Sequence, residues 1–295
     1  MHLHLNPLMN KIIGELIFTL KSPLNIGSGD GERVRDFLRL PDGRLIIPST
    51  TWKGAFRNLS ELIARNTAFS GLPGLAVRLY AEKRAGITYR GDGEQFNKYV
   101  ESFKEEFRKK GREFEILLRE LGYDGGEGEI ERALEDRVIL EKMAEDYLAI
   151  HCPIGKLYGN RVLAGKVRFL DTFLRSGMIY KPGVGIDRAS GKTKEGALYG
   201  VNVVPPGLQI KLKMIIDNLL PGEEDARLFG VTLKTIKAMD LSIGSRKSVG
   251  LGHLGLQDGV FYMVDLRNDE NFAIGNPFKK GRKMTLEELI QWLQS

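Results

Sequence analysis

Alternation of apolar and polar residues marks the first expected strand, at 11–21. Leu16 and Phe18 fall on one side of an extended chain, because side chains in a strand point alternately to its two faces. Residues 208–216 repeat this pattern, and 167–171 show a shorter version of it. We therefore expect three strands that each turn one face toward a core.

Helical periodicity is clearest at 49–63, where apolar residues recur three, four and seven positions apart. Ser49, Thr50 and Thr51 offer hydroxyl groups that can cap the start of this helix. The apolar positions are Trp52, Ala55, Phe56, Leu59, Leu62 and Ile63. One side of the predicted helix is therefore suited to cover a sheet.

Other segments carry helical patterns as well. Apolar side chains at helical spacing predict helices over 96–107, 130–150 and 232–239. Near the C-terminus, Thr285 and Glu288 have the spacing of a capping box and precede a run of apolar residues. A helix is expected to begin there.

The order of these elements indicates a β-containing core interrupted by a helical insertion. The insertion covers 67–150, begins with a stretch broken by glycine and proline, and suits a lid or a partner surface. The core is assigned to 10–66 and 151–265, followed by a C-terminal extension with a helix at 266–295. A long hydrophilic excursion predicts a protruding hairpin at 183–200. The expected fold class is α+β, an antiparallel sheet packed by helices.

Composition excludes several classes of protein. Hydrophobic residues make up 42% and charged residues 28% of the 295, which is typical of a globular chain and excludes a disordered chain, a collagen or a coiled coil. No stretch reaches the ~18 apolar residues that span a bilayer, and residues 1–10 lack the pattern of a signal peptide. We expect a cytoplasmic protein with no membrane contact. The single cysteine, Cys152, excludes an intramolecular disulfide and a zinc-finger set of ligands.

Net charge and glycine content differ from those of an ordinary globular chain and indicate a possible binding partner. The formal net charge is +6, which favours a polyanionic partner if the basic side chains are clustered. Glycine contributes 35 residues, and its densest cluster lies at 243–256. Glycines allow backbone N–H groups to approach an anion, and Arg246 and Lys247 add charge there. The segment matches neither nucleotide-binding glycine motif, so it predicts either phosphate binding of another kind or a plain turn between strands.

Five ordered blocks of sequence span residues 12 to about 260. They are the loop 25–29 with 47–57, then 152–159, then 186–188 with 194–199, then 203–207, and last 243–256. Together these blocks resemble the RAMP superfamily, the RNA-binding subunits of CRISPR effector complexes. They are most similar to the backbone (Cas7-like) subunits of type III complexes. The resemblance implies a ferredoxin-like core, similar to the RNA-recognition motif, with a helical insertion and a thumb hairpin.

The resemblance also implies partners. These are a CRISPR guide RNA, the complementary target RNA, other RAMP subunits, and further copies of the chain in head-to-tail association, which needs a heterologous interface. Lys53 and Arg57 lie four residues apart near a helix N-terminus, where they would share one face and hold phosphates. The full set of expected RNA-binding residues is Gly27, Ser28, Gly29, Arg33, Arg35, Ser49, Thr50, Lys53, Arg57, Arg188, Lys192, Lys194, Arg246, Lys247, Gly250 and Gly252.

Three interpretations of the chemistry remain open. The resemblance implies a metal-dependent endoribonuclease with an aspartate in the first long loop, for which Asp36 is preferred over Asp30, with Mg²⁺ or Mn²⁺ as cofactor. Asp36 could instead only pair with Arg33 or Arg39, in a capping or structural subunit that does not cleave. A third alternative is a metal-independent enzyme that processes guide RNA, for which His253 is placed as general base.

Overall fold

The computed structural model describes residues 7–27, 34–84, 93–110, 116, 118–123, 135–186, 189, 193–266 and 281–295. The chain divides into two compact units. The sheet unit consists of Leu8–Leu59, Val167–Gly222 and Phe229–Ser295, and the main segments of the helical unit are Ser60–Lys166 and Glu223–Leu228.

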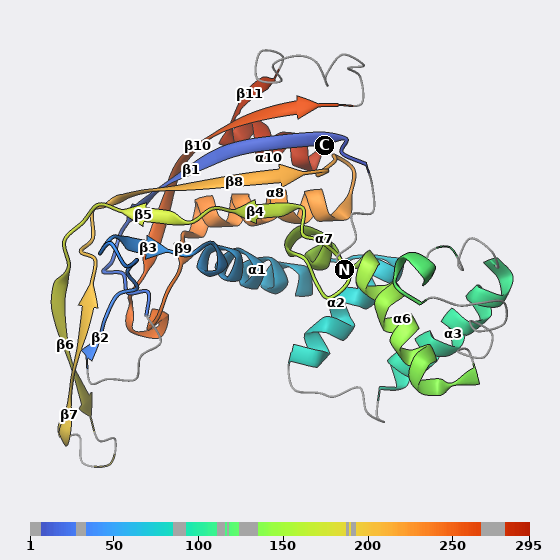
Figure 1. Ribbon diagram of the computed structural model, residues 1–295, viewed down its shortest axis with the longest axis horizontal. Coiled ribbons are helices and arrows are strands. Elements are labelled where there is room, and N and C mark those ends of the chain that lie inside the picture. Colours follow the sequence, from blue (N-terminus) through green and yellow to red (C-terminus); the bar gives the residue numbers. More distant parts are fainter. Residues whose placement is uncertain are drawn as a thin grey trace. The chain divides into compact units, whose positions relative to one another are not determined.

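An antiparallel six-stranded sheet forms the centre of the sheet unit (Figure 1). The strand order is β11-β10-β1-β8-β4, and the short β9 pairs with β10. The strands are β1 (Asn10–Leu20), β4 (Val167–Phe169), β8 (Gln209–Asp217), β9 (Leu241–Ser242), β10 (His253–Asp265) and β11 (Arg282–Thr285). The three strands expected from alternation are β1, β4 and β8.

The order of elements along the chain identifies the fold as ferredoxin-like. β1 is followed by α1 (Ser49–Arg65), β4, β8, α8 (Glu224–Met239) and β10, and the four strands lie in the order β10-β1-β8-β4. This is the arrangement of a split βαβ unit, in which one strand is inserted between the two that a helix connects. The fold class is therefore α+β, as expected.

One face of the sheet is buried against helices. Trp52 of α1 stacks on Phe18 of β1 with ring centroids 5.6 Å apart, and Phe56 of α1 contacts Phe169 of β4. β1 alternates between buried and half-buried residues along its whole length, as the sequence pattern predicted. At Gly14 the ring of Phe261 fills the space of a side chain, because a Cβ there would lie 2.0 Å from Phe261 Cδ1.

The end of α1 differs from the expected apolar face. Leu62 is 49% exposed, whereas Ser60 is fully buried and its hydroxyl lies 2.7 Å from the hydroxyl of Tyr158. A hydrogen bond between two buried hydroxyls replaces apolar contact at this position. Periodicity alone assigned the wrong residue to the buried side.

Two smaller β structures complete the sheet unit. β6 (Ile179–Ile186) and β7 (Thr193–Val203) form an antiparallel hairpin, and β2 (Val34–Arg35) pairs with β7 in parallel. Figure 1 shows this hairpin extending away from the six-stranded sheet. β3 (Leu45–Ile47) pairs with β5 (Thr172–Leu174). The paired strands start before and end after the predicted segment 183–200.

The helical unit contains α2 (Gly71–Arg84), α3 (Glu94–Lys110), α6 (Arg137–His151) and α7 (Pro153–Tyr158). The aromatic residues expected to share a face of α3 are buried. Sequence patterns missed α2, because Pro73 and Gly74 lie in its first turn. Proline is tolerated there, since the first N–H groups of a helix have no partner within it. A Cβ on Gly74 would lie 2.2 Å from the carbonyl oxygen of Phe69.

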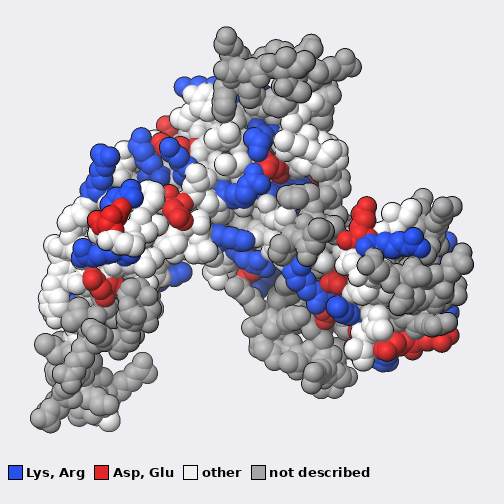
Figure 2. Space-filling model, viewed as in Figure 1, with Lys and Arg blue, Asp and Glu red and all other residues white. Residues whose placement is uncertain are grey.

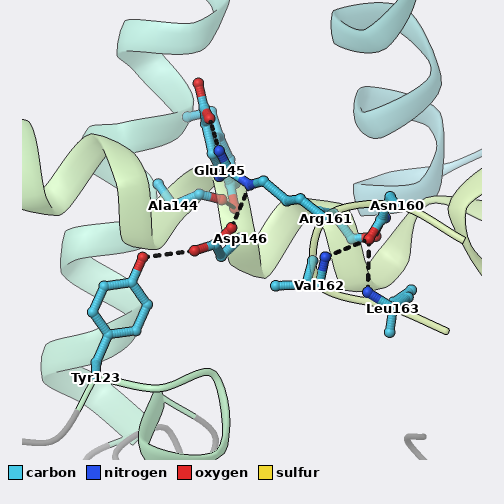
Figure 3. Close-up of polar contacts among 10 residues, drawn as sticks. Tyr123, Ala144, Glu145, Asp146, Asn160, Arg161, Val162 and Leu163 are labelled. Carbon is cyan, nitrogen blue, oxygen red and sulfur yellow. Dashed lines mark hydrogen bonds and ion pairs between the residues drawn. The ribbon is translucent and has the colours of Figure 1, made fainter. Parts of the chain in front are cut away.

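A polar cluster joins α6 to the turn that follows α7 (Figure 3). Arg161 places its Nε 2.6 Å from Asp146 Oδ1 and its Nη1 2.9 Å from Glu145 Oε2. Tyr123 donates its hydroxyl to Asp146 Oδ2 at 2.7 Å. Burial, followed by this hydrogen bond, raises the pKa of Tyr123. The carboxylate of Asp146 is thus held on two sides, which fixes α6 within the helical unit.

The chain ends in α10 (Leu286–Gln294), which has the predicted capping box. Glu288 N–H donates to Thr285 Oγ1, and Thr285 N–H donates to Glu288 Oε2. Leu293 and Gln294 lie against Gly230 of α8, where a Cβ would be 3.1 Å from Gln294 Cγ. No helix in the described ranges is long and apolar enough to cross a membrane.

Candidate nucleic-acid interface

The glycine loop, residues 243–252, connects β9 to β10 at the point where Ser242 pairs with His253. Two of its glycines are required by backbone packing. A Cβ on Gly244 would lie 2.3 Å from the carbonyl oxygen of Asn25, and one on Gly252 would lie 1.9 Å from that of Ile243. Both residues also have positive φ angles. Gly250 differs, because it has a positive φ angle and open space where a Cβ would stand.

Arg246 is the most unusual residue of the glycine loop. It has a φ of 56°, a conformation that is uncommon outside glycine and tends to occur at functional sites. Its guanidinium lies 4.1 Å above the ring of Tyr199 in β7. The buried Nε of Arg246 has no hydrogen-bond partner among the described residues. A planar cation is thus held by an aromatic ring, and a guanidinium group is well suited to bind a phosphate.

A chain of side-chain amides links the glycine loop to three other segments. Ser245 donates its hydroxyl to Asn25 Oδ1 at 2.7 Å, and Asn25 Nδ2 donates to the Asn202 carbonyl oxygen at 2.8 Å. Asn202 Nδ2 in turn donates to Asp36 Oδ1 at 3.1 Å. The first loop, the segment after β2, the base of the hairpin and the glycine loop therefore meet in one place. The first loop, the segment after β2 and the glycine loop contain residues that the sequence predicted for the site, whereas the base of the hairpin does not.

Asp36, the preferred catalytic candidate, lies within the described residues. Its side chain is 48% exposed, Oδ1 accepts hydrogen bonds from Phe37 N–H and Asn202, and Oδ2 lies 3.8 Å from Arg39 Nε. Pairing with Arg39 is thus present, although the two groups are far apart for an ion pair. Among the described residues no group of three or more His, Cys, Asp or Glu side chains could hold a metal ion. Asp36 supplies one carboxylate, which fits a hard cation whose remaining ligands are phosphates and water.

The start of α1 is arranged differently from the expected phosphate site. The Ser49 N–H donates to Asp171 Oδ1 at 2.7 Å, so a carboxylate of the protein already lies at this helix terminus. Thr50 and Lys53 are exposed, whereas Arg57 is half-buried. Lys53 and Arg57 are four residues apart in one helix, as predicted. Their binding of RNA stays a prediction.

His253 stands at the stem of the glycine loop, with both ring nitrogens near protein groups. Nε2 lies 3.0 Å from Asp240 Oδ2, and Nδ1 lies 3.3 Å from Ser242 Oγ. Asp240 Oδ2 is also 2.6 Å from Lys21 Nζ. This arrangement holds β9, β10 and the end of β1 together. As general base, His253 would have to exchange one of these partners for RNA.

Several predicted site residues lie outside the described residues: Ser28, Gly29, Asp30, Arg33, Arg188 and Lys192. Arg35 and Lys194 belong to β2 and β7, but their side chains are outside the description. Gly27 is exposed and forms a bridge with Phe37. Gly27 thereby places Asp36 beside the first loop.

Sequence reasoning missed Asn202, Tyr199 and Ser245 as individual site residues. Asn202 lies between valines in a strand, and an amide in such a run is a signal that a side-chain hydrogen bond is made there. Tyr199 and Ser245 lay within recognised blocks but had no feature that set them apart. Their roles follow from contacts between residues more than forty positions apart.

Basic side chains are widely spread over the molecule. Figure 2 shows Lys and Arg distributed across this face with Asp and Glu among them. The positive charge is therefore not confined to one patch in this view. Local geometry, such as the Arg246 and Tyr199 pair, identifies the interface better than net charge does.

Comparison with known proteins identifies the family of the chain. No curated protein matches the chain. The protein-family model of the RAMP superfamily (RAMPs) matches residues 17–254. The matched range includes all four segments that meet at Asn25, Asp36, Asn202 and Ser245. The chain therefore belongs to the RAMP superfamily, which includes CRISPR-associated repeat-associated mysterious proteins.

Proposed function

We propose that the protein is a guide-RNA-binding backbone subunit of a type III CRISPR interference complex. The observation that carries this proposal is the guanidinium of Arg246, held over Tyr199 at the base of the hairpin. A cation fixed in this way contacts phosphates without reading bases, which suits a subunit that must bind any guide sequence. The partners would be guide RNA, complementary target RNA, other RAMP subunits and further copies of the chain joined head to tail.

Arg246→Ala is expected to weaken binding of single-stranded RNA about tenfold, because the variant removes a stacked, charge-assisted interaction. Fluorescence anisotropy on two unrelated RNA sequences, measured at several salt concentrations, would test this. The slope of log affinity against log salt should become shallower by ~0.7 for each phosphate that the variant no longer binds. Arg246→Lys should recover only part of the affinity, since lysine keeps the charge but not the planar stacking.

Arg44→Ala is the matched control for this experiment. Its guanidinium also lies over an aromatic ring, 4.8 Å from the centre of Phe173, but it is ion-paired with Asp42 at 2.7 Å. RNA affinity and salt slope should stay at the wild-type values. An Arg246→Ala protein with an unchanged salt slope would remove the glycine loop from the RNA-binding site.

The second part of the proposal is that Asp36 catalyses cleavage of the target RNA paired with the guide. The half-exposed carboxylate of Asp36, which accepts a hydrogen bond from Asn202, supports it. Mg²⁺ or Mn²⁺ would be held by Asp36 and by phosphates of the RNA, and would stabilise negative charge at the phosphate that is cut. Asn202 and the Phe37 N–H would keep the carboxylate oriented.

Asp36→Asn is expected to slow metal-dependent target cleavage in the assembled complex by at least about 100-fold, with RNA binding unchanged. Asp30→Ala is the comparison for the first loop, and Asp42→Asn, in an exposed turn, is the control. Loss of cleavage with Asp30→Ala but not with Asp36→Asn would transfer the role to Asp30. A complex that never cleaves would indicate a structural subunit. Cleavage of precursor RNA in EDTA, abolished by His253→Ala, would favour guide processing.

A further inference from the structure

The six-stranded sheet has a second face, opposite to the one that packs against α1. Pairing places Ile13 of β1 beside Tyr262 of β10 and Ile215 of β8, and paired residues point to the same side of a sheet. The row continues to Lys283 of β11 and Arg168 of β4. This row, with the positions beside it on the same side of the sheet, forms the open face, which is ~19 Å wide. Its side chains are half-buried along β1 and exposed or half-buried along β8, whereas those that point to the other side are buried.

The centre of the open face is apolar. Tyr262 is 40% exposed, and the aliphatic side chains beside it are half-buried. Val260 pairs with Glu15, and Ile17 follows two positions further along β1, so the apolar centre extends beyond the first row. Its members are Ile13, Ile17, Ile215, Val260 and Tyr262. Branched aliphatic side chains favour contact with other apolar side chains, since they have no flat ring on which a base could stack.

Basic side chains flank this apolar centre. Lys11 Nζ lies 2.8 Å from Asp217 Oδ1, and Lys211 Nζ lies 3.3 Å from Glu15 Oε1. These two carboxylates are thus already paired within the face, while Lys283 is exposed and lies outside these ion pairs. The basic residues of the open face are Lys11, Arg168, Lys211, Lys213 and Lys283, and the acidic ones are Glu15, Asp217 and Asp258. The face therefore carries a surplus of positive charge.

Length and charge together favour one kind of occupant. From Lys11 to Thr19 the open face runs ~27 Å along β1, which is the length of an α-helix of ~18 residues. A second copy of the chain would bring its own positive surplus against this one. RNA would find Tyr262 as the one aromatic ring among the residues of the open face, and carboxylates near its phosphates. A helix with an apolar stripe between acidic residues matches both the apolar centre and the basic flanks.

We propose that the open face binds an acidic, amphipathic α-helix of a partner protein. The apolar stripe of that helix would cover Ile13 and Tyr262, and its carboxylates would lie beside Lys283 on one side and Lys213 on the other. The inference goes beyond the proposed function and does not rest on it, because no residue of the open face belongs to the set predicted to bind RNA. It gives the chain a protein-binding surface on the side of the sheet away from α1.

A synthetic peptide of ~18 residues tests this assignment. It carries leucines on one helical face and glutamates on either side of them, with a fluorophore at one end. Its binding to the protein is measured by fluorescence anisotropy. A peptide with the same residues in scrambled order, and one with lysine in place of glutamate, should each bind at least about tenfold more weakly. Affinity for the acidic peptide should decrease as salt is added, because part of it is electrostatic.

Variants of the open face locate the binding site. Tyr262→Ala should weaken binding of the acidic peptide about tenfold, since aromatic side chains at the centre of an interface dominate its energy. Lys283→Glu should weaken it about fivefold, because it brings a carboxylate against those of the peptide, and it alters only an exposed side chain. The matched controls are Met239→Ala and Lys234→Glu, two exposed positions of α8, which should bind the peptide as the wild type does.

RNA anisotropy on the same four variants separates this inference from the proposed function, because all four should bind RNA with wild-type affinity. Loss of RNA binding in Tyr262→Ala and Lys283→Glu, with peptide binding unaffected, would assign the face to RNA and overturn the inference. Equal binding of the acidic and scrambled peptides would overturn it as well, and so would a dimer in solution that Tyr262→Ala dissociates. A protein that binds the acidic peptide at the open face but binds no RNA would contradict the proposed function alone.

Discussion

Replacing Lys166 with methionine is expected to lower the free energy of unfolding by about 3–5 kcal/mol, the cost of leaving a buried charge without its partner. Asp225, in the first turn of α8, has a fully buried side chain whose Oδ2 lies 2.8 Å from Lys166 Nζ. The same ammonium is 2.7 Å from Glu223 Oε2. Methionine keeps the length of the side chain but removes the charge, so the carboxylate of Asp225 would stay buried and uncompensated.

The destabilisation should depend on pH. Burial raises the pKa of Asp225 despite the opposing effect of Lys166. The Asp225 carboxyl therefore stays protonated up to a higher pH in the folded protein than in the unfolded chain. Without Lys166 the pKa of Asp225 rises further, so the destabilisation of Lys166→Met should be small near pH 4 and grow as pH rises and the carboxyl ionises.

The stability of the wild-type protein should also decrease at alkaline pH. Burial alone would lower the pKa of Lys166, but Asp225 and Glu223 outweigh it and the pKa is raised above its ordinary 10.5. The stability that charged Lys166 contributes is fully present below pH 10.5. It is lost as the pH rises through the pKa of Lys166 in the folded state. Lys166→Met should lack this alkaline decrease in stability.

Urea unfolding of the variants at several pH values would measure these effects. Lys211→Met is the matched control, because Lys211 is 57% exposed and pairs with Glu15 at 3.3 Å, and it should cost less than about 1 kcal/mol. A double variant, Lys166→Met with Asp225→Leu, should recover most of the stability, since an apolar pair replaces a buried ion pair. Equal destabilisation by Lys166→Met and Lys211→Met would contradict the account of Asp225 as a buried charge.

Several elements of the fold follow from short stretches of sequence. β1, α3 and the capping box at Thr285 could be predicted, because a strand, an amphipathic helix and a cap are each encoded within a few neighbouring residues. α2 was missed because Pro73 and Gly74 break the pattern, although they lie where a helix tolerates them. Proline and glycine are tolerated in α2 because they lie in its first turn. Residue type alone does not show where in a helix a residue will lie.

The candidate site shows more clearly what sequence patterns cannot predict. The glycine loop was recognised, yet Gly244 and Gly252 proved to serve backbone contacts with Asn25 and Ile243. Ser49 was predicted to bind RNA, but its N–H donates to Asp171, which is 122 residues away in the sequence. Periodicity and motif order carry no information about such partners. The resemblance to a family identified which segments matter, and the fold determined how they meet.

Asn25→Ala is expected to lower both stability and RNA affinity, because Asn25 holds the first loop, the hairpin and the glycine loop together. Its side chain is fully buried and joins Ser245 to the Asn202 carbonyl. Alanine would remove both of these part-buried hydrogen bonds, at a cost of about 1–3 kcal/mol in the free energy of unfolding. RNA affinity should fall even where the protein is folded, since Arg246 follows Ser245 and would no longer be fixed over Tyr199.

Urea unfolding and RNA anisotropy on the same preparations would separate this effect from that of Arg246. Asn66→Ala is the control, because Asn66 is exposed and its side chain makes a local bond of 3.3 Å to the Leu62 carbonyl. Arg246→Ala should reduce affinity with little change in stability, whereas Asn25→Ala should reduce both. If Asn25→Ala were less stable but bound RNA as the wild type does, the amide chain would be a structural support alone. A decrease in both would make the buried amide the link between folding of the loops and binding of RNA.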